Sequence, residues 1–243
     1  MGGGIIGCAA AYELSRAGLK CVVVDSQDIG REASWAAAGL ITHPVPGTSP
    51  YMCLRREGHE YFCQVAEEIQ ADISTDIGFR RTGSVNPWFS EDEEQNALEL
   101  ERALEDDGLP VRRLEPSEAL EAVPSIAPEL RGALFIENDY QVHNPRFVRG
   151  VAEVAVRLGA KLLLHQPVTR LLCDSNRVIG VETAAEKLYA DKVILAAGVW
   201  SKALAATVGF HLPVEPVKGQ MVLLGGPPGM VRHILNGEEV YVV

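Results

Sequence analysis

The fold of this chain is decided by the stretch Gly2-Gly3-Gly4-Ile5-Ile6-Gly7. Gly2, Gly4 and Gly7 have the G-x-G-x-x-G spacing of a turn that binds a dinucleotide. In such a turn one glycine permits a tight bend, one lets the backbone approach a pyrophosphate, and one lets the helix pack close to the strand. The pyrophosphate then lies against free N–H groups at the positive end of the helix. The spacing predicts a nucleotide-binding turn at the start of the chain.

The residues after the turn have the composition of a helix and then a strand. We expect a helix over residues 5–18 and a short apolar strand over 20–25. Asp25 ends this strand, 18 residues after Gly7. An acidic residue at this place either accepts hydrogen bonds from the ribose hydroxyls of an adenosine or only starts a turn. A strand should precede the turn as well, but only Met1 does, so we expect the chain to be incomplete at its start.

The charge balance excludes two classes of partner. The chain has 22 basic and 33 acidic residues, a formal net charge of −11, and 47% hydrophobic residues. A chain this acidic is a poor match for nucleic acid or for an anionic membrane surface. An anionic cofactor still fits, because a helix N-terminus acts locally whereas the net charge is diffuse. We also expect no membrane span, because no stretch approaches the roughly 20 apolar residues of a membrane helix.

Cysteine and histidine spacing indicates neither disulfides nor a metal. The five cysteines form no C-x-x-C pair, and the six histidines form no H-x-x-x-H motif. We therefore expect reduced, buried thiols in a cytoplasmic protein without a secretory signal. No metal site is predicted.

The rest of the chain alternates helical and strand patterns. Ser90 and Glu93 match a capping box at the start of one helix. The predicted helices cover residues 53–72, 90–107 and 144–158. The predicted strands cover residues 81–85, 132–136, 139–143, 161–165 and 213–224, with a small β-meander over 168–190.

Two stretches of small residues mark a candidate crevice. Ala36-Ala37-Ala38-Gly39 permits close approach of a flat ring or of backbone. It also fits a short alanine-rich helix packed on the sheet, and the two interpretations are compatible. Residues 193–195 read as a buried strand that ends in Ala196-Ala197-Gly198. Ligands in open α/β sheets bind at the carboxyl ends of strands, so Ala197 and Gly198 are expected to line the same crevice as the glycine turn. The alternative is an ordinary strand-to-helix turn.

Four pieces of the sequence together resemble a known family. They are Gly2-Gly3-Gly4-Ile5-Ile6-Gly7, Arg31-Glu32-Ala33-Ser34-Trp35-Ala36-Ala37-Ala38-Gly39-Leu40, Leu195-Ala196-Ala197-Gly198-Val199-Trp200-Ser201 and Pro216-Val217-Lys218-Gly219-Gln220. Their order and spacing resemble the D-amino-acid-oxidase-type flavoprotein family, and most of all its glycine oxidase branch. The resemblance covers the whole chain, but the chain covers only about two thirds of such a protein. We therefore expect it to be incomplete at both ends.

The resemblance implies an α/β fold of two interleaved domains. A Rossmann-like FAD-binding domain would take residues 1–80 and 145–212. An antiparallel-sheet substrate domain would take residues 81–144 and 213–243. The C-terminal part of both domains would lie beyond this chain.

The implied cofactor is noncovalent FAD. The resemblance places Ile5 and Ile6 at the pyrophosphate, Asp25 and Ser26 at the adenosine end, Ala33 and Ser34 at the central phosphate and ribityl chain, Ala38, Gly39 and Leu40 at the flavin ring, and Val168 at adenine through its backbone. Gly2, Gly4, Gly7, Ala197, Gly198 and Trp200 complete the predicted cofactor set.

The implied reaction is oxidation of a small amino acid or amine of the glycine or sarcosine type, in thiamine biosynthesis. Hydride would pass from the substrate α-carbon to flavin N5, the imine would hydrolyse, and molecular oxygen would yield hydrogen peroxide. The flavin carries this chemistry, so no catalytic side chain is expected in this chain. An arginine beyond residue 243 would hold the substrate carboxylate. Leu40 and Tyr241 would face the substrate, although Tyr241 equally fits a half-buried strand position.

Several alternatives stay open. A truncated, non-catalytic fragment or pseudoenzyme fits the missing first strand and the missing arginine. Sarcosine oxidases and D-amino acid dehydrogenases differ mainly in their electron acceptor and side-chain pocket. An NAD-dependent dehydrogenase fits the glycine turn but leaves the block from Ser34 to Gly39 unexplained. A homo-oligomer is compatible with the sequence.

Overall fold

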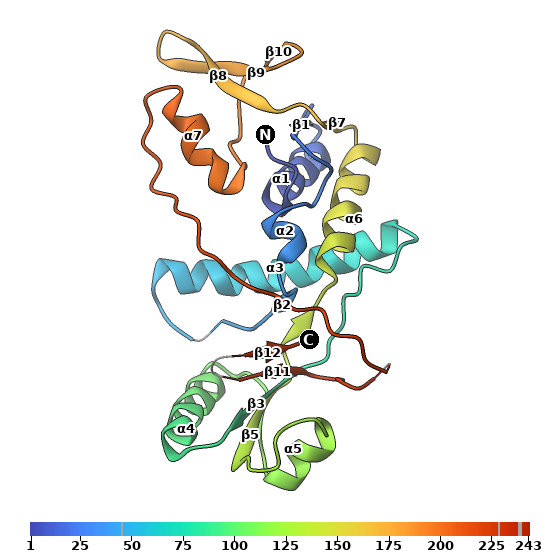
Figure 1. The fold of residues 1–243 in the computed structure, drawn as a ribbon, viewed down its shortest axis with the longest axis vertical. Coiled ribbons are helices and arrows are strands. Elements are labelled where there is room, and N and C mark those ends of the chain that lie inside the picture. The colour runs from blue at the N-terminus through green and yellow to red at the C-terminus, as the bar shows by residue number, and fades with distance from the viewer. Residues whose placement is uncertain (45, 228, 238–239) are drawn as a thin grey trace. The chain divides into compact units, whose positions relative to one another are not determined.

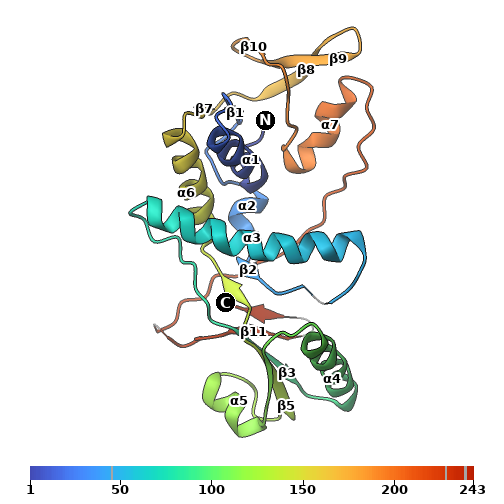
Figure 2. The same ribbon diagram turned by 180° about the vertical axis from the view of Figure 1, so that it is seen from behind.

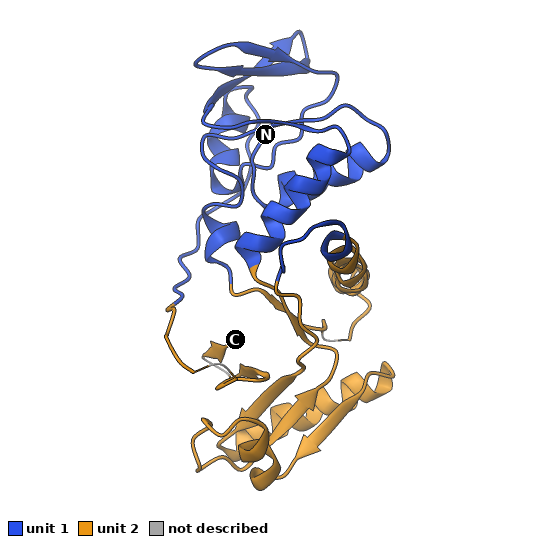
Figure 3. Ribbon diagram, turned by 90° about the vertical axis from the view of Figure 1, so that its right-hand side faces the viewer, with its two compact units in different colours: residues 1–37, 69–77, 144–221 blue, residues 38–68, 78–143, 222–243 orange. Residues whose placement is uncertain are grey.

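The computed structural model describes residues 1–44, 46–227, 229–237 and 240–243. These residues form a mixed α/β structure, as predicted, that divides into two compact units (Figure 3). Unit 1 comprises Met1–Ala37, Ile69–Ile77 and Asn144–Met221, and unit 2 comprises Ala38–Glu68, Gly78–His143 and Val222–Val243. The predicted assignment of an FAD domain and a substrate domain concerns function and stays a prediction.

Unit 1 contains the glycine turn and a small parallel sheet. Its elements are α1 (Ile5–Arg16), β1 (Val22–Val24), α2 (Ala33–Ala36), α6 (Asn144–Arg157), β7 (Lys161–Leu163), β8 (Val168–Asp174), β9 (Arg177–Thr183), β10 (Lys187–Tyr189), the 3-10 helix η1 (Gly198–Trp200), α7 (Ser201–Ala206) and the last residues of α3 (Pro50–Asp72). β1 pairs in parallel with β7, from Val22 opposite Lys161 to Val24 opposite Leu163. This pairing joins segments far apart in sequence. Val23 and Val24 are buried in it, and β-branched residues suit such a strand position.

The helix predicted after the glycine turn is confirmed by α1. It ends at Arg16, and Gly18 adopts a φ of +81° just beyond it. Glycine tolerates this left-handed conformation, and the Leu19 amide closes the end by donating to the Leu14 carbonyl at 2.9 Å. α1 lies beside α6, whose buried face carries Val148, Val151 and Val154 at helical spacing (Figures 1 and 2). The predicted meander is also confirmed, since β8, β9 and β10 form an antiparallel sheet.

Unit 2 is built on a five-stranded sheet. Its elements are β2 (Leu40–Ile41), most of α3, β3 (Ser84–Trp88), α4 (Glu91–Asp106), β4 (Val111–Leu114), α5 (Pro116–Ala122), β5 (Gly132–Ile136), β6 (Tyr140–Gln141), β11 (Ile234–Asn236) and β12 (Tyr241–Val242). The strand order is β12-β11-β3-β5-β4, and every pair is antiparallel except β11 with β3. A separate antiparallel pair joins β2 to β6.

Alternation along β5 explains how α4 and α5 cover this sheet. Ala133 packs in a cluster with Ala119 and Val123 from the α5 region. Its neighbour Leu134 packs in a second cluster with Leu104 of α4. Successive strand residues point to opposite faces, so the two helices cover opposite faces of the sheet, as Figure 1 also shows.

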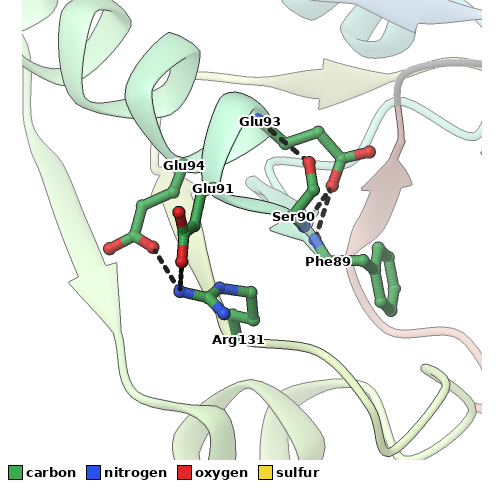
Figure 4. Close-up of polar contacts among 6 residues, drawn as sticks. All are labelled: Phe89, Ser90, Glu91, Glu93, Glu94 and Arg131. Carbon is green, nitrogen blue, oxygen red and sulfur yellow. Dashed lines mark hydrogen bonds and ion pairs between the residues drawn. The ribbon is translucent and has the colours of Figure 1, made fainter.

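The predicted capping box at the start of α4 is confirmed. The Glu93 amide donates to Ser90 Oγ at 3.2 Å, and the Ser90 amide donates to Glu93 Oε2 at 3.0 Å (Figure 4). Arg131 pairs with Glu91 and Glu94 across the same turn. The four acidic residues of the first turn, 91–94, lie at the positive end of the helix, where their charge is favourable.

Two predicted strands are not formed in the described part of the chain. Residues 193–195 bond only to Met1, whose nitrogen donates to the Ile194 carbonyl at 2.7 Å. Residues 213–224 are irregular, and Leu223 is fully exposed. A strand needs a ladder partner along its length, and neither segment has one among the described residues. Residues 193–195 are apolar, as a buried strand would be, but apolar composition alone does not supply a ladder partner.

No helix among the described residues is both long and apolar enough to cross a membrane. The cysteines are all unpaired, as expected, but only Cys8 is buried and Cys173 is exposed. The expectation that all thiols are buried is therefore wrong.

Candidate functional site

Three glycines of the opening turn are required by close backbone or side-chain approaches. Gly2 has a φ of +103°, and a Cβ there would lie 2.2 Å from the Ala196 carbonyl oxygen. A Cβ on Gly7 would lie 1.8 Å from the Gly2 carbonyl oxygen, and one on Gly4 would lie 2.9 Å from Ser34 Oγ. The turn is therefore closed against itself, against Ala196 and against Ser34, which leaves no room for side chains.

Two side chains hold the backbone of this turn in place. The Gly3 amide donates to Asp25 Oδ2 at 2.6 Å, and the Gln27 amide donates to Asp25 Oδ1 at 2.7 Å. The Ile5 amide donates to Ser34 Oγ at 2.9 Å. The structure therefore shows Asp25 as a turn-forming residue, which was one of its two interpretations. Its predicted contact with a ribose stays a prediction, although each carboxylate oxygen keeps a second lone pair.

The start of α1 presents unused hydrogen-bond donors. Among the described residues, the amides of Gly4 and Ile6 have no acceptor. Ser34 accepts the Ile5 amide, and its own hydroxyl proton remains to be donated. The Ile6 side chain is 68% exposed beside these groups. Free N–H groups at the positive end of a helix form a site for a phosphate or another anion.

The first residues of the segment from Ala196 to Trp200 lie beside the glycine turn. The Ala196 amide donates to the Met1 carbonyl at 2.9 Å, and the Ala197 nitrogen would lie 3.0 Å from a Cβ on Gly2. The structure thus brings Ala197 beside the glycine turn, as the crevice argument predicted. Gly198, at a φ of +52°, begins η1. The Trp200 side chain is 55% exposed, so packing within unit 1 does not explain it.

A polar residue that the sequence did not single out lies beside Asp25. The Gln166 amide donates to the Asp25 carbonyl at 2.9 Å. Gln166 Oε1 is buried and has no hydrogen-bond partner among the described residues. A buried acceptor without a partner is rare, and an N–H or O–H of a bound molecule would satisfy it. Val168, the predicted adenine contact, begins β8 two residues later.

The remaining predicted cofactor residues of unit 1 lie near the turn in sequence. Ser26 and Ala33 are exposed, and Ala33 begins α2. Asn144 donates from Nδ2 to the Ala37 carbonyl at 2.7 Å and so holds the end of this block. Cys8 is the one thiol beside the turn. Burial, followed by the charge of Asp25, raises the pKa of Cys8 to about 12, so this thiol stays protonated and is not a nucleophile.

The other predicted site residues belong to unit 2. Gly39 has a φ of +81°, and its carbonyl accepts from the Val142 amide at 2.9 Å. Leu40 is half-buried in β2, and Ala38 directly precedes Gly39. Tyr241 is 42% exposed in β12, opposite Asn236. The interpretation of residues 36–39 as an alanine-rich helix is wrong, because α2 ends at Ala36.

Comparison with known proteins identifies the family of this chain. A family model described as FAD dependent oxidoreductase matches residues 1–243. The chain belongs to this family. It is 34% identical to a glycine oxidase of Pseudomonas putida over 226 residues, which are 92% of this chain and 60% of that protein. It is 31% identical to a glycine oxidase of Geobacillus kaustophilus in an alignment of 247 positions that covers 100% of this chain and 65% of that protein.

A solved structure supports the same assignment. The crystal structure of glycine oxidase from Geobacillus kaustophilus matches with a TM-score of 0.90 and 29% identity, covering 100% of this chain and 66% of that one. The predicted fold class and the predicted family are therefore confirmed. FAD is the cofactor of this family, as predicted. The chain spans less than two thirds of the length of the curated relatives.

The residues of unit 1 fit the phosphate and adenosine portions of FAD. Gly2, Gly4 and Gly7 permit the close backbone and side-chain approaches that shape the turn at the start of α1. The free amides of α1 and the Ser34 hydroxyl provide donors for phosphate oxygens, while Gln166 Oε1 provides an acceptor without a partner. FAD carries both kinds of group, so the donor and acceptor set matches it.

Proposed function

We propose that the whole protein is an FAD-dependent oxidoreductase of the glycine oxidase type that oxidises a small amino acid or secondary amine. The observation that carries the proposal is the bond from the Ile5 amide to Ser34 Oγ at 2.9 Å. This bond joins the nucleotide-binding turn to the block that ends in Gly39 and Leu40. A nucleotide-binding turn alone, as in an NAD-dependent dehydrogenase, leaves that block unexplained. The two glycine oxidases that match most of this chain support the substrate class.

The residues of this chain bind and orient the cofactor. Gly4 and Ile6 would donate their amides to the pyrophosphate, and the Ser34 hydroxyl would donate to the central phosphate and ribityl region. Asp25 would accept from the ribose, and Val168 would meet adenine through its backbone. Ala38, Gly39 and Leu40 would approach the flavin ring, where the absence of bulky side chains at the first two positions permits close contact. Ala197, Gly198 and Trp200 remain proposed contacts.

When bound, FAD would supply the two-electron redox chemistry of amine oxidation, with molecular oxygen as the proposed final acceptor and hydrogen peroxide as the product. Leu40 and Tyr241 would shape the substrate side. In this proposal the chain contributes positioning rather than acid–base chemistry. The five unpaired cysteines support a reducing, cytoplasmic location.

The test uses the full-length protein purified without added flavin. We expect sarcosine or glycine to release hydrogen peroxide in air at a rate that depends on bound FAD. A D-amino acid that is oxidised only with an artificial electron acceptor would instead identify a dehydrogenase. Absence of turnover with every one of these amines, by a protein that carries FAD, would refute the proposal. The variant Ser90→Ala, in the capping box of α4, is the control and should keep the wild-type rate.

A further inference from the structure

A small groove in unit 2 lies between β2 and α3. Its volume is about 260 Å³, and its lining residues are Leu40, Ile41, Thr42, Arg55, Gly58, His59 and Phe62. Arg55, His59 and Phe62 follow the i, i+4, i+7 spacing that places residues on one helix face. Leu40 is also the residue proposed to face the substrate. The groove therefore continues from the proposed substrate side.

Arg55 is a half-buried cation without a carboxylate partner. Among the described residues, its one recorded contact is with the ring of Tyr51, whose centroid lies 5.9 Å from the guanidinium carbon. The neighbouring Arg56 differs, because it pairs with Asp107 at 3.7 Å. The planar fork of Arg55 suits a bidentate carboxylate.

The other groove residues leave this positive charge uncompensated. No acidic side chain is among the lining residues of the described structure. His59 Nε2 lies 3.1 Å from the Asn138 carbonyl oxygen. Burial, and then the charge of His43, lowers the pKa of His59, so its ring is neutral at neutral pH. The charge of the groove is therefore that of Arg55, and Thr42 adds a hydroxyl that donates or accepts.

Gly58 keeps the groove open. It lies inside α3, where glycine weakens a helix relative to alanine. A Cβ at this position would meet no atom of the described structure within 4 Å. Packing among the described residues therefore does not require glycine here. A glycine at position 58 instead leaves space in the groove for a ligand.

We propose that this groove is a carboxylate-binding subsite in which Arg55 holds a second acidic group of the substrate. The proposal rests on the proposed function, because Leu40 links the groove to the substrate side. It assigns a narrower substrate class, namely small amines with two carboxylates. The arginine expected beyond residue 243 would hold the first carboxylate, and Arg55 would hold the other.

The kinetic test compares sarcosine with iminodiacetate, which carries one additional carboxylate in place of a hydrogen. Arg55→Gln in the full-length holoenzyme should lower kcat/KM for iminodiacetate by about tenfold or more, the loss expected for a bond to a charged group, and leave sarcosine within about twofold. Arg55→Lys should recover part of the loss, because lysine keeps the charge without the fork. The matched control Arg56→Gln should match the wild type on both substrates. Equal losses on both substrates, or none, would overturn the subsite.

A binding measurement separates this proposal from the proposed function. Glutarate has the two carboxylates of iminodiacetate at the same chain spacing but no amine, so it should bind without being oxidised, and butyrate is the corresponding analogue of sarcosine. Calorimetry should show glutarate binding weakened about tenfold or more by Arg55→Gln, with butyrate unchanged. If this holds while no amine is oxidised, the subsite stands and the proposed function fails. If amines are oxidised but glutarate binds Arg55→Gln as tightly as the wild type, the subsite fails alone.

Discussion

Replacing Gly7 by alanine tests the glycine turn at its tightest contact. The new Cβ would lie 1.8 Å from the Gly2 carbonyl oxygen, which is backbone and cannot rotate away. Overpacking of this kind costs about 3 kcal/mol at the upper end of its usual range. Alanine returns about 1 kcal/mol through its higher helix propensity. We therefore expect a net loss of about 2 kcal/mol in the free energy of unfolding, from the difference of these two terms.

Gly58→Ala is the matched control for this prediction. Gly58 also lies inside a helix, but a Cβ there meets no described atom within 4 Å. The same chemical change should stabilise the protein by about 0.5–1 kcal/mol. Urea unfolding followed by circular dichroism measures both variants, and repeating it with FAD should show that Gly7→Ala also weakens cofactor binding. If Gly7→Ala is as stable as Gly58→Ala, the close approach of Gly7 to Gly2 is wrong.

Three further predictions concern single side chains. Ser34→Ala removes the acceptor of the Ile5 amide, so it should cost about 1 kcal/mol of stability and weaken FAD binding in a fluorescence titration. Ser34→Thr keeps a hydroxyl and should retain most of the stability and most of the FAD affinity. Ser90→Ala should cost a similar ~1 kcal/mol in urea unfolding but leave FAD affinity unchanged, and a change in affinity would contradict the separation of the two roles. Asp139 is 2% exposed and accepts from Ser84 Oγ at 2.5 Å, and burial raises its pKa above the ordinary value. The folded state therefore holds the Asp139 proton more tightly than the unfolded state does. As pH rises from about 4, the free energy of unfolding of the wild type should fall relative to that of Asp139→Asn. A difference between the two free energies that does not change with pH would refute this.

The sequence predicted the elements whose signals are local. The glycine spacing placed the turn before α1, and Gly18 indicated where that helix ends. Ser90 and Glu93 gave the capping box, because both partners lie within one turn of helix. These signals depend only on residues a few positions apart, so they need no knowledge of tertiary neighbours.

The features that the sequence missed depend on distant partners. Residues 193–195 have the composition of a strand, but among the described residues their ladder bonds reach only Met1. Gln166 gave no sequence signal, because its importance comes from a buried oxygen beside Asp25. Arg55 lies in the predicted helix over residues 53–72, and no sequence motif singles it out. Only its place across from β2, without an acidic partner, distinguishes it from Arg56.

The turn-forming role of Asp25 also required the structure. Its position at the end of β1 was compatible with a ribose contact or with a turn. The two backbone amides that it accepts show that it holds the glycine turn. The sequence alone could not separate the two, because both use the same carboxylate at the same place.

The most direct test of the central claim is the FAD content of the purified full-length protein. The account predicts a yellow protein with stoichiometric FAD that is released on denaturation, since the proposed contacts are all noncovalent. Added FAD at a hundred times its Kd should stabilise the apoprotein by about 2.7 kcal/mol. A colourless protein whose unfolding curve is unchanged by added FAD would contradict the assignment of the opening glycine turn as an FAD site.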